Sequence, residues 1–257
     1  MARASQLPLP PRTREFAMKK LVFLLLLVAV GGWHLYHRDP SIKAPTSGVK
    51  FDYVVRLTGD AGGKDRLPWL VALHGNGDTA GHFFDTALNQ ISVPARVVLI
   101  KGPLPYGTGK AWPWSPEDFE TYGDAVHEAI VELTNRYPTA GEPVLLGFSG
   151  GGMMAWYQAA RHGESYASVF AISGRLDEKQ LGGTVVASDA PVYAWHGRGD
   201  SVVPVGGGKH AAKLLRASGM DVRFNEFEGG HLGIFQDVKL QITQQVEREL
   251  DRAARQW

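Results

Sequence analysis

Residues 144–151 read Val-Leu-Leu-Gly-Phe-Ser-Gly-Gly, and this sequence is the strongest indication of the fold. Its apolar start is typical of a buried strand, and residues 153–160 have the composition of a helix. Between them lies a G-x-S-x-G pattern, with Gly147 and Gly151 on either side of Ser149. This pattern is typical of a sharp strand-to-helix turn, where larger side chains would crowd the backbone. We therefore expect the Ser149 hydroxyl to be exposed on such a turn.

A serine in this turn is predicted to be a nucleophile only if an acid and a histidine accompany it, because the pattern alone also fits a surface serine. Asp200 lies on a turn-rich loop after the apolar run 191–195, and His231 follows the alternating run 222–227 on a glycine loop. The order serine, aspartate, histidine, each on a loop after a strand, is that of an alpha/beta-hydrolase catalytic triad. In such a triad the imidazole accepts the serine proton and the carboxylate orients the imidazole.

The apolar run 70–73 leads into another glycine loop, His-Gly-Asn-Gly-Asp. A loop after the third strand supplies one backbone donor of an oxyanion hole, and the residue after the nucleophile supplies the other. These donors are predicted to be the N–H groups of Asn76 and Gly150. His74 and His82 have no carboxylate or histidine at ligand spacing, so the sequence predicts no metal site, and it indicates no cofactor.

The sequence resembles the phospholipase/carboxylesterase family, which includes bacterial carboxylesterases and acyl-protein thioesterases. The resemblance covers about residues 51–250 and implies an esterase or thioesterase with Ser149, Asp200 and His231 as the triad and the backbone of Asn76 and Gly150 as the oxyanion hole. Family members often have glutamine after the serine and leucine after the first His-Gly, so we expect a reshaped acyl pocket here. Four motifs carry the resemblance, at Leu73–Asp78, Gly147–Gly152, His196–Pro204 and Gly229–His231.

The predicted fold class is α/β, an alpha/beta-hydrolase with a mostly parallel, doubly wound sheet, because strand-like runs alternate with helical stretches. One catalytic domain over residues 51–257 is long enough to bury a sizeable core. The short interval between Ser149 and Asp200 must hold a helix and two strands, which excludes a large cap domain there. The expected strands are Phe51–Leu57, Leu70–Leu73, Val97–Ile100, Val144–Leu146, Val169–Ile172, Val192–Trp195 and Val222–Phe227.

A long loop, residues 101–120, follows one of these strands on the predicted catalytic side. Trp112 and Trp114 in this loop are candidates for the substrate pocket, where they would line an acyl-chain groove. The other interpretation is that both tryptophans pin the loop to the sheet.

The N-terminal region is predicted to lie outside the catalytic domain. Residues 1–38 are predicted to be a signal peptide or a membrane anchor, because Lys19-Lys20 precedes an uncharged, mostly apolar stretch, and residues 39–50 are predicted to be a linker. Met18 is an alternative start that would give a shorter leader. Either interpretation places the enzyme outside the cytoplasm, exported or anchored, with membrane contact through residues 18–37.

Composition narrows the function classes. The chain has no cysteine, which excludes disulfides and a thiol nucleophile, and its formal net charge of +1 argues against nucleic-acid binding. The predicted function is a serine hydrolase that cleaves small-molecule or lipid carboxylic esters or acyl thioesters through an acyl-enzyme. Two alternatives remain open: a polyester depolymerase or serine peptidase with the same triad, and a catalytically silent, membrane-tethered binding module.

Overall fold

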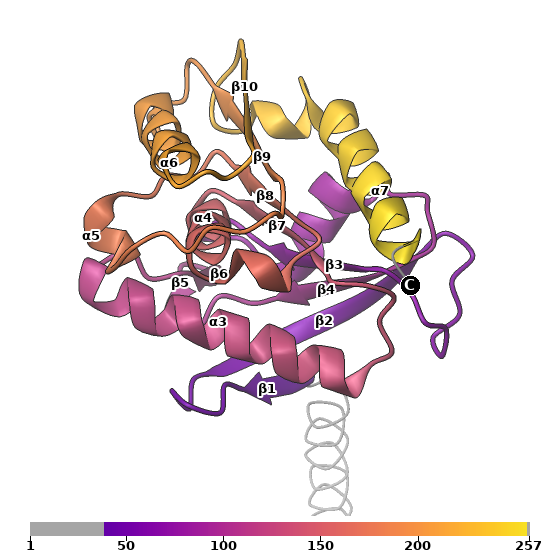
Figure 1. Cartoon of the computed structure of the whole chain (residues 1–257). Coiled ribbons are helices and arrows are strands. Elements are labelled where there is room, and N and C mark those ends of the chain that lie inside the picture. The colour runs from indigo at the N-terminus through magenta and orange to yellow at the C-terminus, as the bar shows by residue number, and fades with distance from the viewer. Residues whose placement is uncertain (1–38, 256–257) are drawn as a thin grey trace, which may run out of the picture. The chain divides into compact units, whose positions relative to one another are not determined.

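The computed structural model describes residues 39–255, so the predicted leader, residues 1–38, lies outside the described residues. An eight-stranded sheet forms the centre of the catalytic domain (Figure 1). All neighbouring strands pair in parallel from β4 to β10, and β1 and β2 complete one edge in antiparallel fashion. This confirms the predicted α/β, mostly parallel sheet. In spatial order the strands are β1 (Ser41–Lys43), β2 (Lys50–Thr58), β4 (Ala95–Ile100), β3 (Trp69–Leu73), β7 (Val144–Phe148), β8 (Ser168–Ile172), β9 (Val192–Gly197) and β10 (Val222–Phe227).

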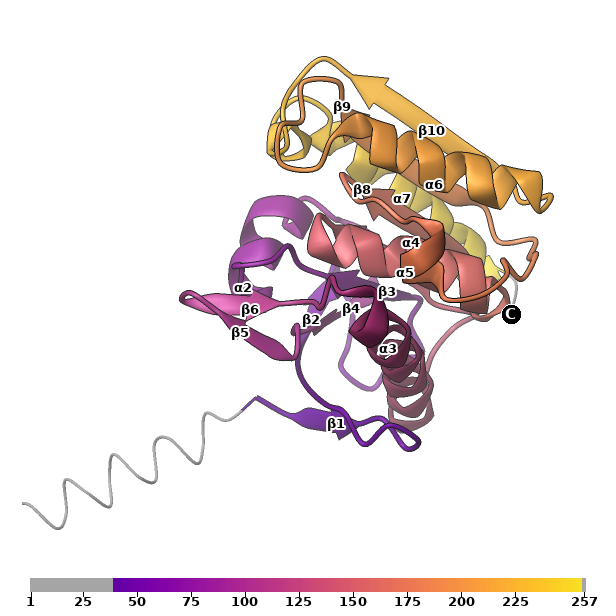
Figure 2. The same ribbon diagram turned by 90° about the vertical axis from the view of Figure 1, so that its left-hand side faces the viewer.

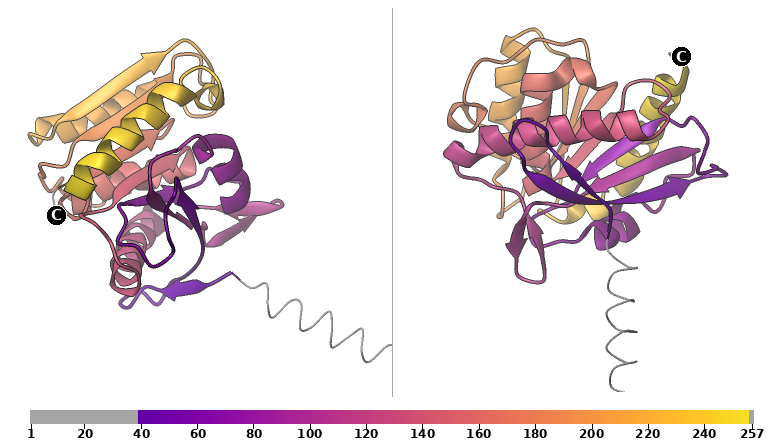
Figure 3. Two further views of the ribbon diagram at one scale, coloured as in Figure 1. Left: turned by 90° about the vertical axis from the view of Figure 1, so that its right-hand side faces the viewer. Right: turned by 90° about the horizontal axis from the view of Figure 1, so that it is seen from below.

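Helices cover both faces of this sheet. Helices α3 (Pro116–Arg136), α4 (Gly150–His162) and α6 (Val205–Ala217) pack on one face, and Figure 2 shows them in front of the strands. The other face is covered by α7 (Lys239–Arg255), visible in the left view of Figure 3, and by the short α2 (Ala80–Phe83) with the π-helical turn Phe84–Leu88. None of the helices among residues 39–255 is long and apolar enough to span a membrane.

The central strands are apolar along their whole length because both of their faces are covered. In β3, Val71 and Leu73 point into the core beneath α3 and α4, whereas Leu70 and Ala72 belong to the core beneath α7. All five residues of β7 are buried. Continuous apolar runs of this kind are typical of parallel strands between two helical layers.

The segment predicted as a linker, residues 39–50, contains a strand in the structure. Residues 41–43 form β1, which pairs antiparallel with β2, and Ile42 and Ala44 are buried in the core. The prolines at positions 40 and 45 lie just outside this short edge strand, where they remove no hydrogen bond between strands. The prolines therefore flank a strand here, and the compact unit that contains the sheet begins at Pro40.

The long loop after β4 contains a small hairpin, β5 (Leu104–Tyr106) and β6 (Gly109–Ala111). The hairpin is bound to the loop after β3: the Gly77 amide donates to the Lys110 carbonyl at 2.8 Å, and the Lys110 amide donates to the Asp78 carbonyl at 3.0 Å. It thereby fixes the loop that carries Asn76 at the carboxyl edge of the sheet.

Candidate active site

Ser149 lies on a strained turn between β7 and α4. Its backbone has φ 55° and ψ −115°, a conformation that residues with a side chain rarely adopt. The turn is possible because its flanking glycines are small: a Cβ at Gly147 would overlap the Gly151 carbonyl, and a Cβ at Gly151 would overlap the Leu73 carbonyl. Strain of this kind is concentrated at functional sites. The local sequence therefore folds into the sharp turn that its glycine spacing predicts.

The structure brings Ser149, His231 and Asp200 into one hydrogen-bonded row. His231 Nε2 is 2.9 Å from Ser149 Oγ, and His231 Nδ1 is 2.7 Å from Asp200 Oδ2. The other carboxylate oxygen of Asp200 accepts the Val202 and Val203 amides at 2.9 and 2.8 Å. The Asp200 side chain is fully buried, so these donors compensate for its loss of water. With the Nδ1 proton held by Asp200, Nε2 is the free acceptor for the serine proton.

His196 is a further neighbour of Asp200 that the sequence reasoning missed. Its Nε2 atom is 2.7 Å from the Val203 carbonyl and 3.3 Å from Asp200 Oδ2. Burial lowers the pKa of His196, which favours a neutral ring that donates from Nε2 to this carbonyl. His196 therefore braces the loop that carries the acid. The available signal was its spacing of four residues before Asp200 in a glycine-containing loop.

The two predicted oxyanion donors, Asn76 and Gly150, both border the cavity beside Ser149. The loop that carries Asn76 is anchored from below by His74, whose Nδ1 contacts the Gly75 carbonyl at 2.7 Å and whose Nε2 accepts the Gly102 amide at 3.0 Å. Burial lowers the pKa of His74, so the neutral ring accepts at Nε2. His74 thus has a positioning role within the loop.

Asn76 and Gly150 are coupled by packing. The Asn76 carboxamide accepts the Trp112 amide at Oδ1, at 2.8 Å, and it occupies the space where a side chain at position 150 would lie. A Cβ at Gly150 would be 2.7 Å from Asn76 Cγ and 3.0 Å from Nδ2, closer than atoms can pack. The two departures from the family pattern noted in the sequence are therefore one structural unit, in which glycine at 150 makes room for the carboxamide at 76.

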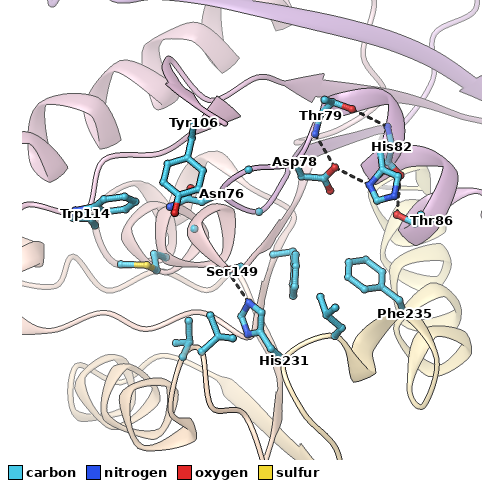
Figure 4. A pocket seen from close by; sticks show the side chains of 18 of the residues that line it. Asn76, Asp78, Thr79, His82, Thr86, Tyr106, Trp114, Ser149, His231 and Phe235 are labelled. Carbon is cyan, nitrogen blue, oxygen red and sulfur yellow. Dashed lines mark hydrogen bonds and ion pairs between the residues drawn. The ribbon is translucent and has the colours of Figure 1, made fainter. Parts of the chain in front are cut away.

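Ser149 opens into a cavity of about 920 Å³ (Figure 4). Figure 4 shows Asn76, Tyr106 and Trp114 on one side of the serine and a more polar group, which includes Asp78 and His82, on the other. A cavity of this size accommodates a small-molecule ligand. Among residues 39–255, no group of three or more histidine or acidic side chains could hold a metal ion.

The two candidate pocket tryptophans have different positions. Trp114 is 53% exposed and lines the cavity. Trp112 does not line it, which corrects the prediction for this residue: its ring is 1% exposed, packs against Phe51 and donates from Nε1 to the His74 carbonyl at 2.8 Å. The indole satisfies a buried carbonyl, so Trp112 pins its loop to the sheet.

Comparison with known proteins identifies the family. The model of the phospholipase/carboxylesterase family matches residues 115–244, a region that includes Ser149, Asp200 and His231. The chain belongs to this family. Membership of the phospholipase/carboxylesterase family makes the protein a hydrolase of the esterase and thioesterase kind and confirms the resemblance seen in the sequence. No curated protein matched the chain in a sequence search.

Solved structures share the fold of this family member. Esterase PE8 is 26% identical, with 76% of this chain and 99% of that chain covered and a TM-score of 0.60. The Bacillus cereus carboxylesterase is 17% identical over 79% of this chain and 94% of its own, with a TM-score of 0.64. Acyl-protein thioesterase 2 of Zea mays is 18% identical over 77% of this chain and 98% of its own, with a TM-score of 0.59.

Proposed function

We propose that this family member is a serine hydrolase that cleaves carboxylic esters or acyl thioesters through an acyl-enzyme. The observation that carries the proposal is the continuous row of hydrogen bonds from Ser149 through His231 to Asp200. The Ser149 end of this row faces the cavity. A hydroxyl becomes a strong nucleophile only when a base removes its proton, and His231 Nε2 lies within reach of that proton.

The reaction follows from this geometry. His231 Nε2 accepts the Ser149 proton as Oγ attacks the carbonyl carbon, and the N–H groups of Asn76 and Gly150 stabilise the negative charge on the carbonyl oxygen. His231 then donates the proton to the departing alcohol or thiol, which leaves the acyl group on Ser149. Water, activated by the same imidazole, releases the acid. Asp200 stays ionised and stabilises the imidazolium.

A second candidate substrate, a polyester or another insoluble ester, is favoured by the mouth of the cavity. Four large apolar side chains that line it are strongly exposed: Tyr106 by 51%, Trp114 by 53%, Val202 by 66% and Leu232 by 63%. Exposed apolar clusters of this kind indicate contact with a ligand or surface. We further propose, from the apolar leader sequence, that the enzyme acts outside the cytoplasm.

The test uses the full chain and its Ser149→Ala variant with p-nitrophenyl esters from acetate to a long-chain acyl group. The proposal predicts hydrolysis that falls by about 10⁴ to 10⁶ in the variant. His231→Ala should lose a similar factor. Hydrolysis that persists in Ser149→Ala would refute the serine mechanism. An intact series of esters, with Ser149 still reactive toward a fluorophosphonate, would instead favour the peptidase alternative, and no reactivity at all would favour the silent binding module.

A further inference from the structure

One cationic side chain lines the cavity without a counter-charge. Arg175 borders the same cavity as Ser149 and is exposed. No hydrogen bond or ion pair joins it to any other residue between 39 and 255. Of the other arginines in residues 39–255, Arg255 alone also lacks such a partner within that range, and it lies at the end of α7 and does not line the cavity. The Arg175 guanidinium is therefore available to a ligand.

The charge balance of the cavity favours an anion. Asp78 is the one carboxylate among the residues that line the cavity in the described part of the chain, and it is already engaged. Its Oδ1 atom accepts the Thr79 amide at 2.7 Å and lies 2.7 Å from His82 Nδ1. Figure 4 shows this group on the opposite side of Ser149 from Tyr106 and Trp114. No carboxylate that lines the cavity in the described part of the chain is therefore free to neutralise Arg175.

The fold holds Arg175 in place. The turn after β8 begins with Ser173, which is buried and has φ 48°, and continues with Gly174, whose Cα packs against the backbone of Gly152. The aliphatic part of Arg175 then rests on the first turn of α6: a Cβ at Gly207 would lie 2.8 Å from Arg175 Cβ and 3.4 Å from its Cδ. The stem of the side chain is supported by α6, so binding a ligand through the guanidinium costs less conformational entropy than for an unsupported arginine.

The neighbours of Arg175 indicate which part of the substrate it meets. Gly174 packs on the start of α4, and Met153, in the same turn of α4, lines the cavity. His231 must donate its proton to the leaving group, so the alcohol faces His231 and the next residue in the chain, Leu232. Tyr106 and Trp114, whose rings meet edge-on at 6.1 Å, lie on the side of Ser149 opposite Asp78 and His82 and offer an apolar wall to the acyl part (Figure 4).

We propose that Arg175 binds a carboxylate at the far end of the acyl group, and that the preferred substrates are half-esters of dicarboxylic acids. This inference rests on the proposed serine hydrolase function. The planar guanidinium fork matches a carboxylate with two parallel hydrogen bonds. The apolar side chains of Tyr106, Trp114 and Met153 contact the methylene chain between the carboxylate and the ester.

The experiment compares substrates that differ only in charge. Methyl half-esters of the dicarboxylic acids from succinate to suberate are each paired with the half-amide, in which a neutral carboxamide replaces the carboxylate. Hydrolysis by the full-length protein is followed in a pH-stat, and the readout is the ratio of kcat/KM for acid over amide. At the best chain length the expected ratio is about ten, a value in keeping with a charge-assisted pair at a partly exposed site.

Variants separate the charge from its position. Arg175→Gln should bring the acid-to-amide ratio to about one. Arg175→Lys should give a ratio between one and the wild-type value, because the charge remains. Gly207→Ala should also lower the ratio, since the new Cβ displaces the arginine stem although the charge is kept. Lys213→Gln, a change to an exposed cation of α6 outside the cavity, is the matched control and should leave the ratio at the wild-type value. Added salt should reduce the wild-type ratio.

Two results would overturn the inference. One is a wild-type ratio near one at every chain length while p-nitrophenyl esters are hydrolysed, and the other is an Arg175→Gln ratio equal to that of the wild type. Both leave the serine hydrolase function standing. If neither the half-esters nor the p-nitrophenyl esters are hydrolysed, the proposed function fails, and the assignment of Arg175 fails with it.

Discussion

Replacing Gly150 with alanine tests how the oxyanion loop is held. The new Cβ would lie 2.7 Å from Asn76 Cγ, so the carboxamide must leave its place. Its hydrogen bond from the Trp112 amide, 2.8 Å long, is then lost, and the loop that carries the Asn76 N–H loses an anchor. The substitution adds one carbon atom, yet we expect it to damage both stability and catalysis.

The size of each effect follows from the contacts. An unsatisfied, partly buried amide costs about 1 to 3 kcal/mol. For a domain of this size that lowers Tm by about 2 to 12 °C. A displaced oxyanion donor lowers kcat by about 10²-fold to 10³-fold. The change in KM should be small, because the donor acts mainly on the transition state.

The assay is a double-mutant cycle with Gly150→Ala, Asn76→Ala and both together, read by kcat on a p-nitrophenyl ester and by Tm. If the clash with the carboxamide causes the damage, alanine at 150 has no further effect once Asn76 is alanine. The double variant should then match Asn76→Ala within about twofold in kcat. Wild-type kcat in Gly150→Ala, or losses that multiply in the double variant, would refute this coupling.

Two further predictions concern the loops around the cavity. The first contrasts the two tryptophans. Trp112→Phe should leave the acyl-chain preference unchanged and reduce the free energy of unfolding by about 1 to 3 kcal/mol, because the buried His74 carbonyl loses its donor. Trp114→Ala should change the acyl-chain preference and leave the free energy of unfolding within about 0.5 kcal/mol of the wild-type value; hydrolysis rates over an ester series and urea unfolding measure the two properties. Acidification from about pH 7 to pH 5 should lower Tm, because burial lowers the pKa of His74 and His196 and the unfolded chain therefore binds more protons as the pH falls through about 6.5. A Tm that is flat over this range, or one that rises, would contradict the second prediction.

The central strands could be predicted because burial on both faces makes them continuous apolar runs. Their ends differ from prediction by a residue or two, as for Val144–Leu146, which extends to Phe148. The edge strand β1 escaped prediction because a strand of three residues, flanked by two prolines, gives no periodic signal. Its pairing with β2 and the burial of Ile42 are tertiary effects.

The candidate site was predictable where chain order determines position. Loops that follow neighbouring parallel strands meet at one edge of the sheet, so Ser149, Asp200 and His231 could be expected to meet. Contacts across the sheet edge could not be predicted in this way. The hydrogen bond from the Trp112 amide to Asn76 depends on how two loops pack together, and the sequence of neither loop contains a motif that predicts it.

The most direct test of the serine mechanism is mass spectrometry of the full-length protein after reaction with a fluorophosphonate. We expect a single phosphonyl adduct on the peptide that contains Ser149, formed in the wild type and abolished or strongly slowed in His231→Ala. A folded protein that forms no adduct, or one that carries its adduct on another residue, would contradict the assignment of Ser149 as the nucleophile.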